Sequence, residues 1–535
     1  MLAIQIFLLS ACPAPPDGSG DSTVKDDAPG PDTATDTGDD SGTDTAMETG
    51  GETGDTEDTA GDTDTGDTGE DTAPVAADIT GDLRPSDADV IVNGGEGDNV
   101  GYGAAVGDID NDGIPDLIAG AHADDAGGAD GGALYIFPSP GSGTYTGADA
   151  THTLYGAEGD HLPSRTLVVD FDRDGAMDLL ASSAGADYDA DLTDSGNLYV
   201  LFGPSGGWAA SGSISSSADR TWSGSTANAY LGGALVAAGD MNGDGWSDVL
   251  TGAVYESAGA LNRGVAMVLL AGTGGTGDGA LETHAAASSW YGVANETAGR
   301  SLAGCDLDGD GAADMVVGGN FWSPEPGVVD PVGRVAVVDA LTARSAGLNS
   351  KLDDAPAQFT GETAYELLGQ DVACLGDDSG SGYNALAMAS NSGAVIGKVT
   401  IVDGGSAFFS TGTTTAKAAG VAVLSGAFNE LSFGQSIAAG DVNGDGLTDL
   451  VVGAGEETDG SSFVWLFDGP LTASASRTTA TAHATITGAQ PGDRFGIATD
   501  VADLNGDGFG DLVVGADLAD EAADNAGQLT VFFAK

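Results

Sequence analysis

The sequence has few aromatic and few basic residues. Aromatic side chains make up 6% of its 535 residues, and 15 Lys and Arg stand against 83 Asp and Glu, so the formal net charge is −68. Such a charge repels a phosphate backbone, and we therefore expect no nucleic-acid partner. Glycine is abundant instead, at 88 residues. Many glycines with few aromatics favour short strands joined by tight turns, so we predict an all-β fold.

Cysteine is also scarce. Cys12, Cys305 and Cys374 are too few for a disulfide framework. Cys305 and Cys374 stand just ahead of corresponding loops in two neighbouring repeats, which are described below. Two alternatives stay open for this pair, a disulfide bridge and two buried free thiols, and we expect free thiols because buried free cysteine is common.

The first 11 residues, MLAIQIFLLSA, form an apolar run too short to cross a bilayer but long enough for the core of a secretion signal. The tetrad LSAC that ends at Cys12 resembles the lipobox of bacterial lipoproteins, in which the cysteine is acylated and becomes the mature N-terminus. The absence of Lys or Arg before Cys12 departs from that pattern. The resemblance implies a signal peptide over residues 1–11 and a secreted protein lipid-anchored to the bacterial outer membrane or cell surface. A plain cleaved signal and an ordinary buried segment remain the alternatives.

Residues 12–86 are a low-complexity tract rich in Asp, Thr and Gly. Between residues 13 and 86 there are 21 acidic residues, two basic residues and no aromatic residue. Such a segment cannot bury enough apolar surface to offset its chain entropy. We predict a disordered linker that self-repulsion keeps extended.

Residues 87–535 contain one pattern seven times. A short strand, a turn, an acidic loop and two further apolar strands recur, with the acidic loops beginning at Asp108, Asp170, Asp240, Asp306, Gly376, Asp441 and Asp503. Four short strands in each of seven evenly spaced repeats predict a seven-bladed β-propeller. The second strand of each repeat, LVVGA from Leu512 for example, is apolar throughout and should be buried on both faces.

The two ends of the propeller domain should pair with each other. The chain stops soon after the third strand of the last repeat, whereas residues 89–93, DVIVN, precede a turn like those ahead of the other repeats. We therefore expect residues 89–93 to pair with residues 529–533 and close the ring, which removes exposed strand edges.

Six of the seven acidic loops follow the pattern Asp-x-Asp/Asn-x-Asp-Gly-x-x-Asp. Carboxylates at alternate positions of a tight loop converge on one point, as calcium requires of its oxygen ligands, and the glycine at position six permits the sharp turn. The flanking segments are strand-like, unlike the helices of an EF-hand. We predict about six Ca²⁺ ions, held by side chains at positions one, three, five and nine: Asp108, Asp110, Asp112 and Asp116; Asp170, Asp172, Asp174 and Asp178; Asp240, Asn242, Asp244 and Asp248; Asp306, Asp308, Asp310 and Asp314; Asp441, Asn443, Asp445 and Asp449; and Asp503, Asn505, Asp507 and Asp511.

The fifth loop, GDDSGSGYN from Gly376, departs from the pattern. Aligned on Gly376, it keeps only Asp378 at a ligand position. We expect this loop to bind no metal.

Phe433-Gly434 and Phe495-Gly496, each followed by an acidic loop and then by Gly453-Ala454 or Gly515-Ala516, resemble FG-GAP repeats. The other repeats have looser pairs, such as Gly232-Gly233 in the third and Ala298-Gly299 in the fourth. The resemblance covers residues 88–535 and implies the propeller of integrin α chains, with calcium in the acidic loops and a partner on the opposite face. It implies adhesion or ligand recognition without identifying a ligand.

Five scattered histidines show no metal-ligand spacing, and we find no nucleophile elbow and no repeated polar ring for a central channel. We expect a ligand-binding protein that is not an enzyme, and its ligand should be an extracellular protein or polysaccharide. We also expect it to contact the membrane only through the lipid anchor and to be a monomer. A propeller-fold hydrolase or lyase acting on extracellular polysaccharide and a purely structural surface protein stay open as alternatives. Aromatic residues in loops could mark the binding face, and the candidates are Tyr188, Trp208, Trp222, Trp290 and Trp322.

Overall fold

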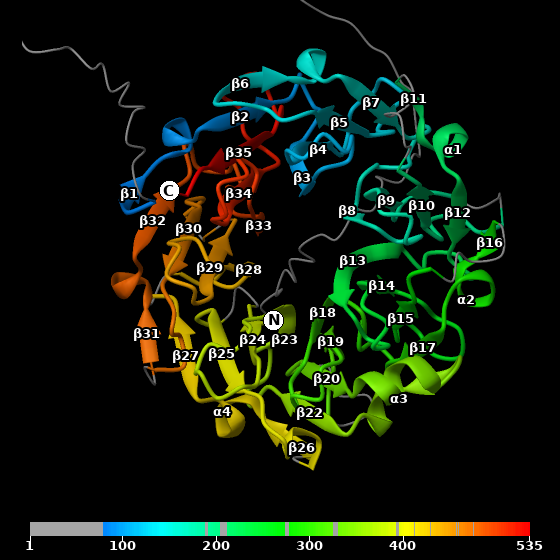
Figure 1. The fold of residues 1–535 in the computed structure, drawn as a ribbon, viewed down its shortest axis with the longest axis vertical. Coiled ribbons are helices and arrows are strands. Elements are labelled where there is room, and N and C mark those ends of the chain that lie inside the picture. Colours follow the sequence, from blue (N-terminus) through cyan, green and yellow to red (C-terminus); the bar gives the residue numbers. More distant parts are fainter. Residues whose placement is uncertain are drawn as a thin grey trace, which may run out of the picture. The chain divides into compact units, whose positions relative to one another are not determined.

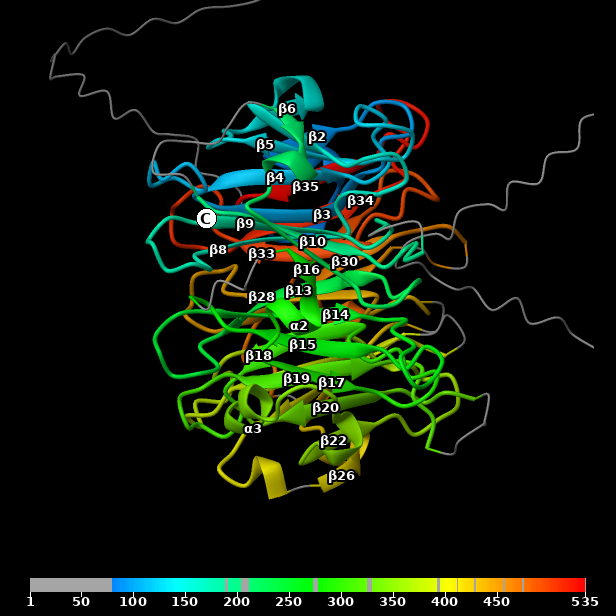
Figure 2. The same ribbon diagram turned by 90° about the vertical axis from the view of Figure 1, so that its right-hand side faces the viewer.

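The computed structural model describes residues 79–534, apart from 188–190, 204–210, 273–277, 325–329, 392–394, 411, 428–429, 456, 458 and 474–475. In this part of the chain, seven five-stranded sheets surround a central axis (Figure 1). Figure 2 views the same ring from its edge. The predicted seven-bladed all-β propeller is confirmed. The signal segment 1–11, Cys12 and the linker as far as residue 78 lie outside the described residues.

Four antiparallel strands of each blade run outward from the axis, in chain order except in the last blade, where β2 from near the N-terminus is the fourth strand. The innermost strands are β3 (Val100–Gly107), β8 (Arg165–Val169), β13 (Leu231–Gly239), β18 (Ser301–Cys305), β23 (Leu368–Cys374), β28 (Ser436–Gly440) and β33 (Ala498–Ala502). The second strands are β4 (Asp116–Ala121), β9 (Asp178–Ser183), β14 (Asp248–Ala253), β19 (Asp314–Gly319), β24 (Ala385–Ser390), β29 (Asp449–Ala454) and β34 (Asp511–Ala516).

The third strands are β5 (Ala133–Phe137), β10 (Asn197–Leu201), β15 (Val265–Leu269), β20 (Arg334–Val338), β25 (Lys398–Asp403), β30 (Phe463–Phe467) and β35 (Gln528–Phe532). The fourth strands are β7 (His152–Tyr155), β12 (Arg220–Ser223), β17 (Ser288–Tyr291), β22 (Ala357–Thr360), β27 (Ala422–Ser425), β32 (Ala484–Thr487) and β2 (Val90–Asn93).

The core lies between the blades. Every residue of all seven second strands is buried, as their apolar sequences predict. Seven clusters of buried apolar side chains occur, one at each junction of neighbouring blades. Each blade is therefore buried on both faces, and the apolar area shared between neighbours stabilises the ring.

The ring closes as the sequence predicts. Strand β2 pairs antiparallel with β35, and Val90 faces Val531 while Val92 faces Leu529. Val90 and Val92 are fully buried. Strands from near the two ends of the described chain thus complete one blade, which leaves no open edge there.

Each sheet has a fifth strand that the sequence analysis did not anticipate. We call these the linking strands: β1 (Gly81–Leu83), β6 (Gly143–Thr146), β11 (Gly212–Ser213), β16 (Gly279–Ala280), β21 (Ser350–Lys351), β26 (Gly412–Thr415) and β31 (Ser476–Thr478). Each comes just before the fourth strand of one blade but pairs in parallel with the fourth strand of the preceding blade. Strand β1 also shows that the folded part begins before residue 87, so the predicted linker boundary at residue 86 is wrong.

A short helical turn lies between each linking strand and the fourth strand that follows it. These turns are α1 (Ile214–Ser217), α2 (Leu281–His284) and α4 (Ala416–Ala419), with 3-10 turns at Pro85–Asp87, Gly147–Asp149, Leu352–Asp354 and Thr479–Thr481. Helix α3 (Ala340–Ser345) instead lies between the third strand β20 and the linking strand β21. A further 3-10 turn spans Phe408–Ser410. Among the described residues, no helix is long and apolar enough to cross a bilayer.

Cys305 and Cys374 form a disulfide, with 5.4 Å between their Cα atoms. The expectation of free thiols is wrong, because the innermost strands β18 and β23 of neighbouring blades bring the two residues together at their last positions. The bridge therefore joins two blades across their junction.

The aromatic candidates for a binding face are mostly buried. Trp222 is fully buried against Phe171 at the junction of the second and third blades, and Trp290 donates to the carbonyl of Ala343 from another junction. Trp322 is half-buried beside the Arg334 guanidinium. Tyr188 and Trp208 lie outside the described residues. The expectation that Trp222 and Trp290 are exposed is wrong, because blade junctions need large apolar side chains.

The glycine of each Phe-Gly-like pair has a positive φ, between 80° and 106°, at Gly101, Gly232, Gly299, Gly369, Gly434 and Gly496. A Cβ at Gly299 would lie 2.5 Å from the carbonyl oxygen of Val265, so both conformation and space require glycine. In the third repeat the pair is therefore Leu231-Gly232, and the predicted pair Gly232-Gly233 is one residue out of register.

Candidate calcium sites

The acidic loops join the innermost strand of each blade to the second strand, and their first aspartate organises the turn. In the first loop, the Asp108 carboxylate accepts hydrogen bonds from the backbone N–H of Asp112 at 3.0 Å and of Gly113 at 2.9 Å. The position-five side chain, Asp112, accepts from Ile114 N–H at 2.8 Å. The same three bonds recur in the third, fourth, sixth and seventh loops. The second loop keeps the last two of them, while its Asp174 N–H donates to Asp172 instead. Short acceptor side chains and a glycine at position six thus wind the loop.

The aspartate at position nine is the first residue of the second strand and is buried in all six loops. In the first loop, Asp116 Oδ2 accepts from Ile109 N–H at 2.9 Å, and Oδ1 accepts from Ser139 N–H at 2.9 Å. Asp178, Asp248, Asp314, Asp449 and Asp511 make the corresponding bonds. This carboxylate therefore ties the loop to the second residue after the third strand.

Positions one, three and nine converge. Carboxylate oxygens from these positions lie within 4.8 Å of one another in three loops, those of Asp108, Asp110 and Asp116, of Asp170, Asp172 and Asp178, and of Asp306, Asp308 and Asp314. In the other three loops position three is Asn, and its side-chain nitrogen lies 3.3–3.5 Å from the position-nine carboxylate. Oxygen donors gathered in this way on a tight loop suit a hard divalent cation, so the residues fit calcium.

Electrostatics at these sites favour a cation. Burial raises the pKa of the position-nine carboxyl, to about 6 for Asp178, Asp248 and Asp511 and to about 7 for Asp314, despite the backbone donors. Burial acts on Asp240 as well, but four backbone N–H groups hold its pKa below the ordinary value. A divalent ion between such groups would compensate for the lost hydration of the buried carboxylate.

The fifth loop has the same backbone hydrogen bonds to its first aspartate as the other loops, but its first position is one residue later than predicted. Asp377, not Gly376, accepts from the backbone N–H groups four and five residues on, at 2.8 Å each, as a first-position aspartate does. Position nine is then Ala385, the first residue of β24, so the buried carboxylate is missing. Asp378 instead accepts from the N–H of Leu471 at 2.7 Å and from Thr472. The prediction of no metal in this loop stays a prediction.

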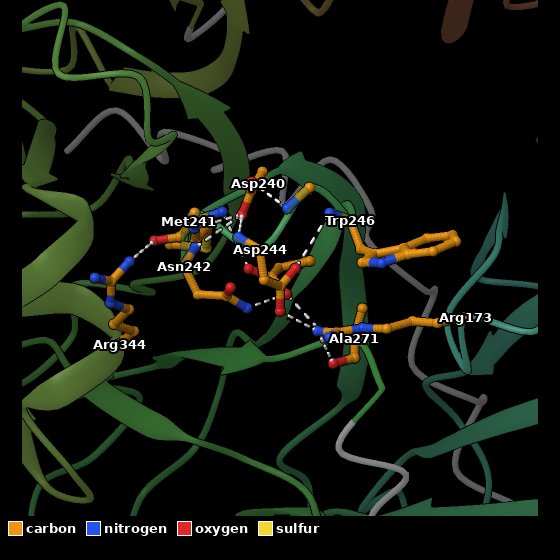
Figure 3. Close-up of polar contacts among 11 residues, drawn as sticks. Arg173, Asp240, Met241, Asn242, Asp244, Trp246, Ala271 and Arg344 are labelled. Atoms are coloured by element: carbon orange, nitrogen blue, oxygen red, sulfur yellow. Dashed lines mark hydrogen bonds and ion pairs between the residues drawn. The ribbon is translucent and has the colours of Figure 1, made fainter.

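An arginine side chain of the second loop forms an ion pair with the third loop. Figure 3 shows Arg173, at position four of the second loop, donating to the Asp244 carboxylate at position five of the third loop and to the Ala271 carbonyl oxygen. On the other side, Arg344 of α3 donates to the Met241 carbonyl oxygen at 2.6 Å (Figure 3). Asp244 is thus shared between its own loop and Arg173, which the sequence pattern did not indicate.

Sequence reasoning also missed polar groups at the axis. Arg165, Arg300, Gln370, Asp371 and Gln435, from four of the seven blades, line a cavity among the innermost strands. The only available signal was that Arg300, Gln370 and Gln435 each directly follow the glycine of a Phe-Gly-like pair.

Two histidines lie near this cavity. His122, buried at 8% exposure, stacks on His161 with ring centroids 5.0 Å apart, and it also contacts the cavity residue Tyr102. Burial lowers the pKa of His122 to about 4. His122 is therefore a buried turn residue.

Known proteins resemble this chain in its repeats. The FG-GAP repeat family matches residues 433–467 and 495–532, and the FG-GAP-like repeat family matches residues 108–181. Integrin alpha pat-2 of Caenorhabditis elegans is 30% identical over 234 residues, and that of Caenorhabditis briggsae is 27% identical over 231 residues. Integrin alpha-PS2 of Drosophila melanogaster is 40% identical over 95 residues.

These alignments cover small parts of the relatives. Each nematode alignment spans 41% of this chain and 18% of the integrin, and the Drosophila alignment spans 16% and 6%. A solved structure of BBS1N in complex with ARL6DN, soaked with lead, aligns at a TM-score of 0.42 and 11% identity, over 81% of this chain and 92% of that one. The fold and the repeated loops define a β-propeller of FG-GAP repeats. The chain carries segments that match FG-GAP repeats, and its propeller is integrin-alpha-like.

Proposed function

We propose that this protein is a calcium-binding propeller of the cell surface that recognises an extracellular ligand and has no catalytic role. The observation that carries the calcium assignment is the convergence of carboxylate oxygens from positions one, three and nine to within 4.8 Å. The six loops that match the pattern contribute 21 carboxylates, and six Ca²⁺ ions would compensate for twelve of these charges. Metal binding then relieves repulsion that otherwise destabilises the loops.

The recognition role is supported by the repeats and by the relatives named integrin alpha. The ligand that we propose is an extracellular protein or polysaccharide, bound by a monomer. A propeller fold alone does not establish function, so this part of the proposal rests on the resemblance.

The surface location is supported by two features of the chain. Disulfides such as Cys305–Cys374 persist in oxidising compartments outside the cytosol. The N-terminal run that ends at Cys12 has the form of a lipoprotein signal. We propose that Cys12 carries the lipid anchor. We expect the parent protein to be retained on the membrane and Cys12→Ser to be released in soluble form. Unchanged retention of Cys12→Ser would contradict the proposal.

Calorimetric titration of the chelator-stripped full chain with Ca²⁺ tests the metal assignment. We expect about six equivalents, because six loops carry the complete ligand set, and a rise in Tm with calcium. A chain that takes up no calcium would refute the assignment. Mg²⁺ at the same concentration is the matched control, since it demands a tighter octahedral shell than these loops provide.

A further inference from the structure

A cavity of about 300 Å³ lies among the innermost strands, and all seven blades contribute to its wall. Its lining includes apolar residues, four charged side chains, and the amide and hydroxyl groups of Gln370, Gln435 and Thr499. That volume is at the lower end of the range of small-molecule sites, which hold a few polar groups in a mainly apolar wall.

The positive charges lie at one end of this cavity. Arg165 is the first residue of β8, and Arg300 directly precedes β18, whereas the acidic loops follow the other end of the innermost strands. Asp371 is close to the two arginines, and Asp500 is the third residue of β33, nearer the acidic loops. Two guanidinium groups and one carboxylate leave one net positive charge at the end opposite the acidic loops.

In the part of the chain that the structure describes, Arg300 shares the charge of the Asp371 carboxylate with Arg165 and has no carboxylate to itself. Among the described residues it forms no ion pair and no side-chain hydrogen bond, although its side chain is half-buried and surrounded by the blades. Burial lowers the pKa of Arg300, and the nearby Arg165 acts in the same direction, but a guanidinium stays protonated in proteins. A charged group enclosed in this way is costly without an anion beside it.

The neighbouring amides are oriented as donors. Gln435 Oε1 accepts from Gly455 N–H at 2.9 Å, and Gln370 Oε1 accepts from Asn320 Nδ2 at 2.9 Å. Their oxygens are thus occupied, and their NH₂ groups remain available to a ligand acceptor. Asp371 accepts two backbone N–H groups, from Ile437 at 2.9 Å and Val372 at 3.0 Å, which holds its carboxylate in place.

Ligand hydroxyl groups would find acceptors beside these donors. Thr499 donates to Ser436 at 3.1 Å, and Ser436 donates to the Gly496 carbonyl oxygen at 2.9 Å, so the Thr499 oxygen keeps its lone pairs for a ligand. Asp371 offers further lone pairs. A single net positive charge suits a monoanion, and a planar carboxylate matches the fork of a guanidinium.

We propose that the axial cavity binds a sugar acid, with its carboxylate at Arg300 and Arg165 and its hydroxyl groups at Asp371 and Thr499. This inference deepens the ligand-recognition part of the proposed function and rests on it for its biological meaning. It adds a ligand class and a site to that function.

The test is calorimetric titration of the calcium-saturated full chain with D-glucuronate, D-glucose and inorganic phosphate. We expect one site for glucuronate, and binding of glucose and phosphate at least tenfold weaker. Glucose has the same ring without the carboxylate, so equal binding of the two sugars would overturn the proposal. Equal binding of phosphate would show a general anion site and would also overturn it.

Substitutions of cavity residues test which side chains bind glucuronate. Arg300→Gln should weaken glucuronate binding at least tenfold, and Gln435→Glu, which keeps the acceptor for Gly455 but adds a negative charge, should do the same. Arg477→Gln is the matched control, because Arg477 lies on the linking strand β31 and, within the described part of the chain, donates to the carbonyl oxygens of Asp468 and Pro470. Parent-like affinity in both cavity variants, each with a parent-like Tm, would refute the assignment.

The outcome also separates this inference from the proposed function. A protein that binds calcium but not glucuronate would refute only the cavity assignment. A protein that binds glucuronate but no calcium would refute the metal sites and leave the cavity in place.

Discussion

Replacing one carboxylate in one loop tests the calcium sites most directly. Asp112 is exposed, and one of its carboxylate oxygens accepts from Ile114 N–H at 2.8 Å. Asp112→Asn keeps an oxygen for that bond but reduces the carboxylates of the first site from four to three. Because ligand charge tunes calcium affinity, we expect the first loop to lose at least tenfold in affinity while the metal-free protein stays intact.

The expected loss of stability follows from linkage. A site held at 100 times its Kd adds about 2.7 kcal/mol, and one weakened tenfold adds about 1.4 kcal/mol, so the variant loses about 1.3 kcal/mol in calcium. Unfolding roughly 450 residues changes the entropy by about 0.95 kcal/mol/K, which converts that loss into a Tm decrease of about 1.4 °C. Scanning calorimetry with and without calcium measures it, and titration should show one tight equivalent fewer.

Asp377→Asn in the fifth loop is the control. Asp377 accepts two backbone N–H groups as a first-position aspartate does, but its loop lacks the other carboxylates at ligand positions. This variant should leave the number of calcium ions unchanged. If Asp112→Asn and Asp377→Asn change calcium binding equally, or if neither changes it, the loop assignment is wrong.

Three further predictions follow from contacts that only the structure revealed. Arg173→Gln should tighten metal binding in the third loop by up to about fivefold, because exposed ion pairs contribute about 0.2–1 kcal/mol; Trp246 at position seven of that loop should report it by sensitising bound Tb³⁺. His122→Phe should gain up to about 3 kcal/mol of unfolding free energy relative to the parent as pH falls from 6.5 to 4. The folded pKa of about 4 lies below the ordinary value, so the unfolded parent takes up the proton first and the parent loses stability over this range. Cys305→Ser with Cys374→Ser should lower the free energy of unfolding by up to about 4 kcal/mol, the entropy of a closed loop of about 70 residues.

Each of these predictions has its own contradicting result. Unchanged Tb³⁺ affinity in Arg173→Gln would mean that the arginine does not compete with the metal. A pH-independent difference between His122→Phe and its parent, measured by urea unfolding, would mean that His122 titrates normally in the fold. If the double-serine variant is as stable as the disulfide-bonded parent, the bridge does not restrain the unfolded chain.

The repeating parts of the structure could be predicted from the sequence. The second strands are apolar at every position, so their burial on both faces and the blade count follow from hydrophobic pattern and period. Pairing of residues 90–93 with β35 followed from the missing outer strand of the last repeat. The acidic loops were recognised because their ligand positions have fixed spacing.

The other features depend on contacts between blades, for which the sequence has no pattern. The linking strands are two to four residues long and have sequences such as Gly212–Ser213 and Ser350–Lys351, which no periodicity marks. The disulfide depends on the distance between two adjacent innermost strands. The register of the fifth loop was misread because alignment on Gly376 ignored the backbone bonds that Asp377 accepts. Arg300 is a single residue at a position that varies among the repeats.

Because of the linking strands, a sequence repeat and a blade of the propeller do not have the same boundaries. Each repeat gives one strand to the blade before it and receives one from the blade after it, and β1 makes the same contact for the sixth blade that β31 makes for the fifth. Excising a single repeat would therefore leave one blade short of its outermost strand and another strand without a partner. Duplicating an internal repeat, by contrast, would preserve every such exchange, whereas the last blade, which both ends of the described chain complete, could not be duplicated in this way. Growth by whole internal repeats is thus limited by how closely the sheets can pack about the axis.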